Sequence, residues 1–409
     1  MSGNPRSLSD RYRISILVAI SSARIIYAIN WYTLSPGLDQ VATDFHASLQ
    51  NLGVLESAFL VGAGLFQIPS SYAAARYNAK LIAVSGLMVI AVANGLGAFA
   101  PSFDSLLVLR FALGIGAAMF FSPAITLVSP LFRGERQGLA LGIYNSSFSI
   151  GGALALLGWS FFVQLYGWRG GLLLGAILAG AASLSLLFII RHTLEDSSVV
   201  AMSYEATSKA VLGVLHNKQI WFMGVGMVGL WSALYAVTQF LPFFETRINL
   251  LDPKLSGLLA SLILVMPIPG ALIGGFLSDR LRNRRVFMLF PAIIFGVGTA
   301  LIGFSDFYES LGLFAVLGLI EAFAFTALYA APFQMDDLSL GQKTIAISLM
   351  NSVQILGAFV LPILFTEVAS TLGYNYAWVA AGVFALVFVP LLLLVKEPFK
   401  KDTVNTSNA

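Results

Sequence analysis

The chain has 409 residues, of which 58% are hydrophobic and only 11% are charged. Soluble domains carry about 25% charged residues, so this composition excludes a water-soluble globular protein and predicts a polytopic protein of the lipid bilayer. The sequence has no cysteine and only three histidines, all in predicted loops, which excludes disulfides and predicts neither a metal site nor a cofactor. We attribute the net charge of +3 to membrane topology and expect no nucleic-acid partner.

Apolar runs of roughly 18 to 25 residues recur along the whole chain, and each has the length that a helix needs to cross a bilayer core. The first run follows a basic N-terminus without a small-residue cleavage site, so we expect an uncleaved span rather than a removed signal peptide. The pattern predicts an all-α membrane protein with twelve transmembrane helices. The expected spans are residues 14–37, 50–72, 80–100, 105–129, 138–164, 170–190, 219–243, 255–278, 286–305, 310–333, 343–367 and 375–395.

A long polar stretch separates the sixth expected span from the seventh. We therefore expect an N-terminal six-helix bundle in residues 1–190, a cytoplasmic linker in 191–218 and a C-terminal six-helix bundle in 219–409. With the N-terminus in the cytoplasm, 18 of the 23 Lys and Arg residues fall in inward-facing segments, three in outward loops and two inside spans. This bias predicts that both termini are cytoplasmic, and we expect the plasma membrane as the location.

The two halves of the chain resemble each other at a nearly constant offset of about 205 residues. The segment 133–154 aligns with 339–360, which pairs Asn145 with Asn351, and 98–106 aligns with 303–311. A six-span unit duplicated in parallel predicts two bundles around a central cavity, as in transporters that work by rocking. We expect the protein to be a monomer.

The loop after the eighth span reads GGFLSDRLRNRR, residues 274–285, and the fourth span contains LRFALGIGAA, residues 109–118. The first stretch resembles a signature of the major facilitator superfamily, with Gly275, Asp279 and Arg280 in the expected places. The second resembles the fourth-span signature of the same family, with an arginine followed by spaced glycines that let helices pack closely. The resemblance implies the superfamily fold and transport by alternating access.

The same resemblance implies a conformational gate formed by Asp279, Arg280 and their first-half counterpart Arg76. The aspartate would bind the neighbouring helix in one conformation and release it in the other, although a basic inward loop with an incidental aspartate gives the same pattern. In the first half, Ala75 replaces the acid, so we expect the second-half copy to carry most of the gate. The glycine–proline pair of the superfamily's antiporters is missing from span five, which argues against a drug–proton exporter.

Two opposite charges reach the same depth of the bilayer from opposite ends of the chain. Arg24 lies about 16 Å beyond Arg13 along the first span, and Glu321 lies a similar distance below Ser310 in the tenth. On a lipid-facing helix each charge would cost at least about 2.5–3.5 kcal/mol, so we expect both to face protein or a water-filled cavity.

The superfamily resemblance implies that spans one, four, seven and ten line the cavity, and we expect a small-molecule substrate there. A guanidinium in a low-dielectric pocket suits a carboxylate or phosphate, because its fork geometry is bidentate. The chain also resembles the organic-anion branches of the superfamily. The predicted substrate-binding residues are Arg24, Tyr27, Trp31, Arg110, Trp231, Tyr235, Gln239 and Asn351.

Proton coupling is predicted for Glu321 and Glu56. Relatives that couple anion entry to protons often keep a glutamate seven residues after the fourth-span arginine, where this chain has Ala117, whose repeat partner is Glu321. Burial disfavours the charged form of that carboxylate and a nearby arginine favours it. Glu56 is equally well explained as a simple partner of Arg110.

The sequence thus predicts a secondary transporter, not an enzyme, that moves a small carboxylate-type anion, with protons as the coupling ion. Five alternatives remain open at this point. An Arg24–Glu321 pair would lock helices together, Arg24 would snorkel if the first span began later, and the aromatic residues would pack against lipid or core. A neutral solute such as a sugar, or a sensor or scaffold that no longer transports, would fit the same spans.

Overall fold

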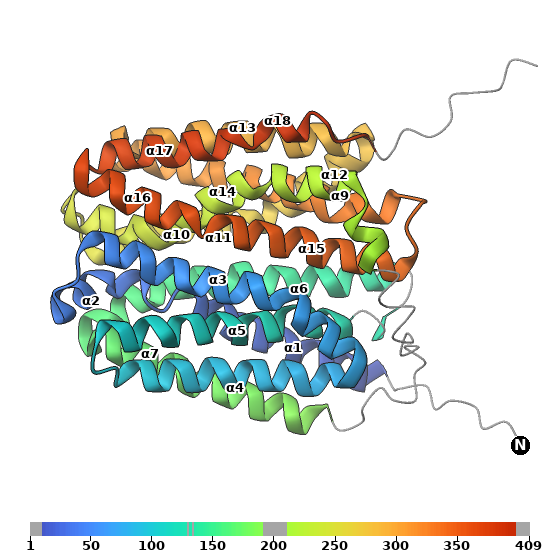
Figure 1. Ribbon diagram of the computed structural model, residues 1–409, viewed down its shortest axis with the longest axis horizontal. Helices are drawn as coiled ribbons and strands as arrows, with labels where there is room; N and C mark the ends of the chain where they lie inside the picture. The colour runs from blue at the N-terminus through green and yellow to red at the C-terminus, as the bar shows by residue number, and fades with distance from the viewer. Residues whose placement is uncertain (1–9, 129–130, 133–134, 191–210, 398–409) are drawn as a thin grey trace, which may run out of the picture.

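The computed structural model describes residues 10–128, 131–132, 135–190 and 211–397 (Figure 1). The side chains at 75–76, 135–139, 141, 340–341 and 344 lie outside this description, as does most of the predicted linker 191–218. The first half comprises α1 (Asp10–Trp31), η1 (Ser35–Gly37), α2 (Leu38–Phe45), α3 (Leu49–Ala73), η2 (Ala74–Asn78), α4 (Ala79–Ala98), α5 (Phe103–Val128), α6 (Glu135–Leu154), η4 (Ala155–Trp159) and α7 (Ser160–Ile189).

The second half contains more helical pieces because several of its spans are broken near their middle. It comprises α9 (Lys218–Gly226), α10 (Val228–Arg247), α11 (Pro253–Val265), α12 (Pro267–Leu281), α13 (Arg284–Leu301), η6 (Ile302–Phe304), α14 (Phe307–Ala330), η7 (Ala331–Gln334), α15 (Leu340–Ala358), α16 (Val360–Thr371), α17 (Tyr374–Val387) and α18 (Val389–Leu392).

The described residues confirm the prediction of twelve transmembrane helices. Eleven stretches are long and apolar enough to cross a bilayer, and one of them, Gly142–Ile189, has 48 residues. A helix of that length would extend about 72 Å, more than twice the bilayer core. It is interrupted at Gly167, whose positive φ of 70° is easily adopted only by a residue without a Cβ. This stretch therefore contains two spans, which brings the total to twelve.

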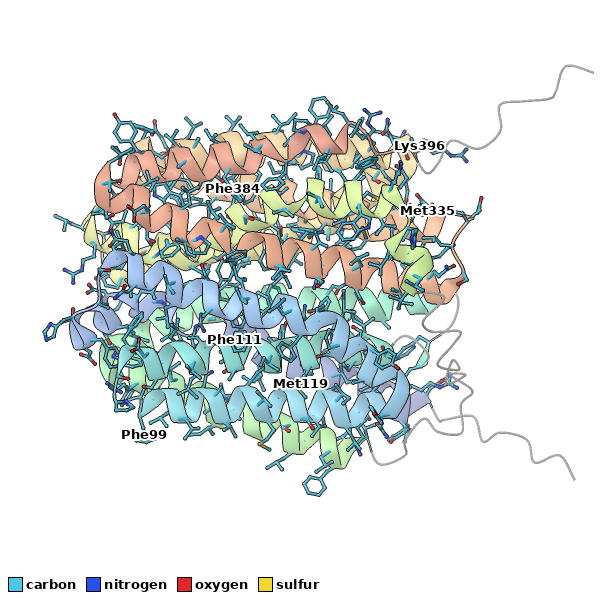
Figure 2. The ribbon with its side chains drawn as sticks, viewed as in Figure 1. Phe99, Phe111, Met119, Met335, Phe384 and Lys396 are labelled. Carbon is cyan, nitrogen blue, oxygen red and sulfur yellow. The ribbon has the colours of Figure 1, made fainter. Side chains whose placement is uncertain are left out.

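The outer surface of the molecule is suited to lipid. Side chains project from the periphery of both bundles (Figure 2), and many exposed ones are large and apolar, such as Ile177, Leu272 and Val387. The helices satisfy their own backbone hydrogen bonds, as a protein in hydrocarbon must. The fold is thus that of a multi-pass membrane protein.

The helices form two side-by-side bundles, one from each half of the chain (Figure 1). Across the interface α3 packs against α15 and α16, α6 and η4 pack against α11, and η1 packs against α10. Glycines permit the closest approaches: a Cβ at Gly64 would lie 2.9 Å from the backbone of Leu356, and one at Gly257 would lie 2.7 Å from the carbonyl of Leu156. The small residues therefore let the two bundles come into backbone contact.

The two bundles are joined mainly at the end of the molecule that contains α2, opposite the end with the N-terminus (Figure 1). There Asp39 forms an ion pair with Arg247, and Gln50 donates a hydrogen bond of 2.7 Å to Ser370. Ser57 donates one of 2.6 Å to the carbonyl of Phe359. In the described part of the chain, the hydrogen bonds between the bundles involve first-half residues from α1's last turn to the middle of α3, so the bundles close at the α2 end.

Candidate functional site

Arg24 lies in the middle of α1 inside a cage of aromatic rings. The carbon at the centre of its guanidinium is 4.5 Å from the ring centre of Tyr27, at i+3 on the same helix. The rings of Phe121 on α5 and Tyr144 and Phe148 on α6 lie 4.7, 5.1 and 4.7 Å away. The electron-rich faces of these rings attract the cation, which explains how a permanent charge is tolerated at this depth.

The guanidinium of Arg24 is nevertheless incompletely satisfied. Its Nε and Nη1 are buried and have no hydrogen-bond partner, and 6% of the residue remains exposed. Buried donors without partners are costly, so an acceptor oxygen placed beside these nitrogens would be stabilising. Arg24 does not snorkel, because its rings hold it more than twelve residues from the start of α1.

Glu321 on α14 is the corresponding acidic group of the second bundle. It is 6% exposed, and its Oε2 is buried without a hydrogen-bond partner. Within the described residues, the ion pairs closer than 4.0 Å do not include Arg24 with Glu321. Tyr32 and Tyr329 each interact electrostatically with both charges. The two charges therefore share one region of the interface without forming a direct pair.

Arg110 has a partner of its own. Its Nη2 lies 2.7 Å from Oε2 of Glu56, and the two side chains are 2% and 0% exposed. The hydroxyl of Tyr235 donates to the same carboxylate oxygen at 2.9 Å and lies 3.3 Å from the Glu56 carbonyl. In this conformation Glu56 binds Nη2 of Arg110 and the hydroxyl of Tyr235, while Nε and Nη1 of Arg110 are buried without a hydrogen-bond partner. The contact of Arg110 and Tyr235 with a substrate stays a prediction.

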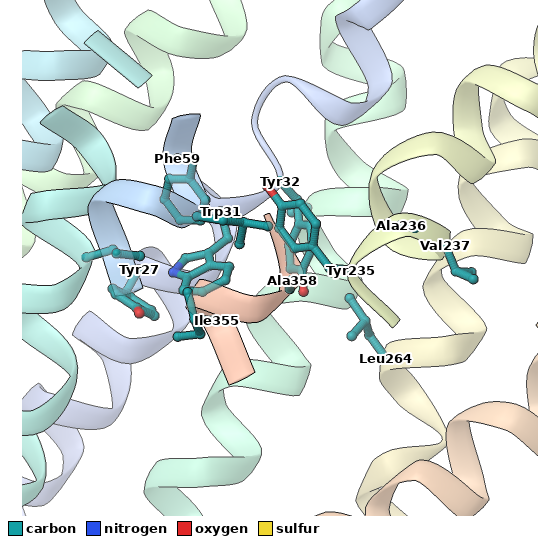
Figure 3. Packing of buried hydrophobic residues seen from close by; sticks show 14 of the residues in the cluster. Tyr27, Trp31, Tyr32, Phe59, Tyr235, Ala236, Val237, Leu264, Ile355 and Ala358 are labelled. Atoms are coloured by element: carbon teal, nitrogen blue, oxygen red, sulfur yellow. The ribbon is translucent and has the colours of Figure 1, made fainter. Parts of the chain in front are cut away.

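The predicted aromatic contacts form a closed layer between the bundles. Trp31 lies 5.9 Å from Trp231 and 4.6 Å from Phe59, and Trp231 stacks on Tyr235. Figure 3 shows Trp31 between Tyr27, Phe59 and Tyr235. Trp231 is partly exposed, while the other predicted aromatic residues are buried. The layer lies about 10 Å beyond Arg24 along α1, on the side of the α2 end.

The two predicted amides have different surroundings. Gln239 is fully buried, and its Nε2 donates to the carbonyl of Trp31 at 3.3 Å, so it reinforces the aromatic layer. Asn351 on α15 is 5% exposed and accepts a hydrogen bond of 3.3 Å from the hydroxyl of Tyr329. Asn351 is thereby connected to the region between Arg24 and Glu321.

Three cage residues, Phe121, Tyr144 and Phe148, were missed by the sequence reasoning. A signal was present for Phe121, because it follows Arg110 by eleven residues, close to three full turns, and so lies on the same helix face. Tyr144 and Phe148 are spaced by four residues on α6, but their spacing alone does not reveal which face meets α1.

Comparisons with known proteins give the family of the chain. The family model of the Major Facilitator Superfamily matches residues 20–256 and 249–409.

The chain belongs to the major facilitator superfamily.

Several curated relatives in the superfamily span nearly the whole chain. The nitrite extrusion protein of Bacillus subtilis (strain 168) is 25% identical over 93% of this chain and 94% of its own length. The cis,cis-muconate transport protein of Acinetobacter baylyi is 23% identical over 97% of this chain and 98% of its own length. The probable sulfoacetate transporter of Cupriavidus necator is 25% identical over 95% and 96%. The chain is thus a membrane transporter and not an enzyme.

The fold is also found in solved structures. A bacterial homologue of the human lysosomal transporter Spinster, in an inward-facing and unoccupied conformation, superposes with a TM-score of 0.78 at 15% identity, over 96% of this chain and 98% of its own. At this identity the comparison establishes the fold alone.

The aspartate of the superfamily's loop signature binds Arg284, an arginine that was not among the predicted gate residues. Asp279, at the end of α12, forms an ion pair with Arg284 at the start of α13. Arg284 is buried and also donates to Ser278 and to Oε1 of Gln334, whereas Arg280 is exposed. The side chain of Arg76 lies outside the described residues. The sequence did contain an indication of this role, because the motif ends in two consecutive arginines, Arg284 and Arg285.

Proposed function

We propose that this superfamily member moves a small organic anion of the carboxylate type across the plasma membrane by alternating access, coupled to protons. The observation that carries the proposal is the guanidinium of Arg24, which is buried at mid-depth, has two unpartnered nitrogens and has no carboxylate within 4.0 Å among the described residues. A carboxylate substrate would supply the missing acceptors and the opposite charge.

The names of the relatives support an anionic substrate. Nitrite, cis,cis-muconate and sulfoacetate are all anions at neutral pH, and a further relative is a probable L-galactonate transporter of Escherichia coli. These substrates differ in size and in number of charges, so they support the class of anion rather than one compound.

Alternating access assigns a role to each half of the chain. Residues 1–190 and 219–409 act as the two rocking bundles, and 191–218 is the linker between them. With both termini in the cytoplasm, the α2 end faces outward, so the bundles meet on the outer side and Arg24 lies on the inner side of the aromatic layer. Opening of that layer gives access from outside.

Glu321 is the proposed proton-coupling group. It belongs to the bundle opposite Arg24, is buried, and has an unpartnered carboxylate oxygen. Binding of a proton would remove a charge that is expensive to bury, and a substrate anion at Arg24 changes the electrostatic field that Glu321 experiences. Glu56 is assigned instead to the ion pair with Arg110.

One observation favours a second candidate, a neutral solute. The four rings around Arg24 compensate part of its charge by themselves, as they would for an arginine with a purely structural role. In that case the charges stabilise the bundles, and the substrate contacts the polar groups of the interface instead.

Uptake into liposomes separates the two candidates. The wild-type protein should take up at least one of nitrite, cis,cis-muconate, sulfoacetate and the monocarboxylate sorbate, and Arg24→Ala should abolish that uptake. Arg11→Ala, on the exposed first turn of the same helix, is the matched control and should transport normally. Unchanged uptake by Arg24→Ala, or uptake of glucose but of no anion, contradicts the proposal.

A further inference from the structure

The charges at the bundle interface can be counted group by group. Of the two arginines inside spans, Arg110 is neutralised by Glu56 at 2.7 Å. Arg24 is left as the one uncompensated cation that the described spans place at mid-depth. A substrate with one negative charge is therefore fully matched, because one guanidinium binds one carboxylate.

A second carboxylate on the same substrate would have no favourable place. Around Arg24 it would meet the faces of Tyr27, Phe121, Tyr144 and Phe148, which carry negative potential. Toward the second bundle it would meet Glu321, a buried carboxyl group that offers no positive charge. Burying an unpaired charge is costly, so the arrangement discriminates against dianions.

The remaining surroundings are suited to a flat body. Trp231 is partly exposed beside the buried Trp31, with ring centres 5.9 Å apart, and Phe148 lies 5.7 Å from Trp31. Ring faces pack best against planar, polarisable groups. Two polar groups of this region already have partners, since Nε2 of Gln239 donates to the carbonyl of Trp31 and Asn351 accepts from Tyr329. Nε1 of Trp31 and Oε1 of Gln239 are buried without a partner.

We propose that the Arg24 site selects small monoanions with a planar, unsaturated body, in preference to dianions and to saturated chains. This inference rests on the proposed function, because it names the substrate class of the same site. Arg24 binds the carboxylate, the cage holds the guanidinium in place, and Trp31 and Trp231 contact the flat body. Glu321 offers no positive charge to a second carboxylate.

Four six-carbon probes test one property at a time. Sorbate has a planar diene and one carboxylate, trans,trans-muconate adds a second carboxylate, hexanoate lacks the double bonds, and 2,4-hexadien-1-ol lacks the charge. Equilibrium binding to the purified full-length protein is measured by calorimetry at neutral pH. We expect sorbate to bind about tenfold or more tightly than muconate, because the second charge is buried without a partner. The affinity for sorbate should exceed the affinity for hexanoate by about two- to tenfold, the range expected for aromatic stacking.

The outcomes separate the inference from the proposed function. If muconate or hexanoate binds as tightly as sorbate, and if that binding disappears in Arg24→Ala, the proposed selectivity is overturned. The proposal of an anion transporter then still holds. The alcohol binding as tightly as sorbate, or Arg24→Ala binding sorbate normally, overturns both. Glu321→Gln retains the shape of the side chain and cannot ionise, so the disadvantage of muconate at neutral pH should persist. A lost disadvantage would show that the charge of Glu321, and not the lack of a second cation, opposes the dianion, and would overturn this part of the inference.

Discussion

Tyr235 of α10 donates a hydrogen bond of 2.9 Å to Oε2 of Glu56 on α3, the oxygen that Arg110 also binds, at 2.7 Å. The tyrosine belongs to the second bundle and the ion pair to the first. A buried ion pair inside one bundle is thus completed by a hydroxyl from the other. A movement that separates the bundles at this level breaks the hydrogen bond from Tyr235 and leaves Glu56 with Arg110 as its remaining partner. The stability of the Glu56–Arg110 pair therefore depends on whether the bundles are closed at the α2 end.

We predict that Tyr235→Phe shifts the protein away from the conformation closed at the α2 end. The change removes one hydrogen bond to a charged group, worth about 1.5–3 kcal/mol, and retains the ring that stacks on Trp231. Because the chain has no cysteine, spin labels at Thr43→Cys and Leu372→Cys report the distance across the α2 end. The longer-distance population should grow. Tyr308→Phe, at an exposed tyrosine, is the control, and equal distributions in both variants contradict the prediction.

Glu56→Leu should destabilise the protein strongly. It leaves the buried charge of Arg110 without a counter-charge, and breaking a buried pair in this way costs about 3–5 kcal/mol. The double variant Glu56→Leu/Arg110→Met removes both charges and should recover much of the loss. Unfolding in detergent measures both. Asp10→Asn, which removes an exposed pair with Arg13, serves as the comparison and should cost no more than about 1 kcal/mol. A double variant no more stable than the single one would show that the unpaired charge of Arg110 is not the cause of the loss, and would contradict the prediction.

Phe148→Leu should weaken binding of sorbate. The substitution removes one of the rings that orient Arg24, and a lost cation–π contact of about 1–2 kcal/mol corresponds to roughly five- to thirtyfold in affinity. Tyr144→Phe is a matched variant, because it keeps the cage ring and removes only the hydroxyl that donates to the carbonyl of Phe121. It should bind within about threefold of wild type. Calorimetry measures both, and a larger loss in Tyr144→Phe than in Phe148→Leu argues against the cage.

Proton coupling should depend on Glu321. Glu321→Gln cannot gain or lose a proton at this position, so uptake driven by a pH gradient should fall to the level seen without a gradient. Exchange of internal for external substrate, which needs no net proton movement, should persist. Glu367→Gln changes an exposed glutamate of α16 and should keep its response to the gradient. A gradient response retained by Glu321→Gln removes this residue from the coupling mechanism.

The loop signature should depend more on Arg284 than on Arg280. Arg284 is buried and bonds Asp279, Ser278 and Gln334, whereas Arg280 is exposed. Arg284→Ala leaves several of these groups without a partner, so it should slow transport in liposomes and lower thermal stability. Arg280→Ala has the same change in charge and should have the smaller effect on both measurements. Larger losses of transport and stability in Arg280→Ala than in Arg284→Ala would contradict this prediction and support the assignment of the gate to Arg280.

The sequence by itself determined the class of protein and the number of spans. Apolar runs matched to the bilayer thickness are a local property, because each helix satisfies its own backbone hydrogen bonds in lipid. The same local reasoning placed Arg24 and Glu321 at mid-depth, since depth follows from rise per residue alone. Tyr27, three residues further along the same helix, shares the face of Arg24 by helix geometry, and the structure places its ring 4.5 Å from the guanidinium.

Only the tertiary structure decided which side chains meet across helices. Successive residues differ by about 100° around a helix, so a small uncertainty in helix rotation changes which neighbour a side chain faces. For this reason the partner of Arg110 stayed open until α3 placed Glu56 against it, and Phe121 and Phe148 were not recognised as the walls around Arg24. Tyr235 was predicted to bind the substrate, but the approach of the two bundles directs its hydroxyl to Glu56. Depth is encoded along one helix, whereas partnership is set by how helices rotate and cross.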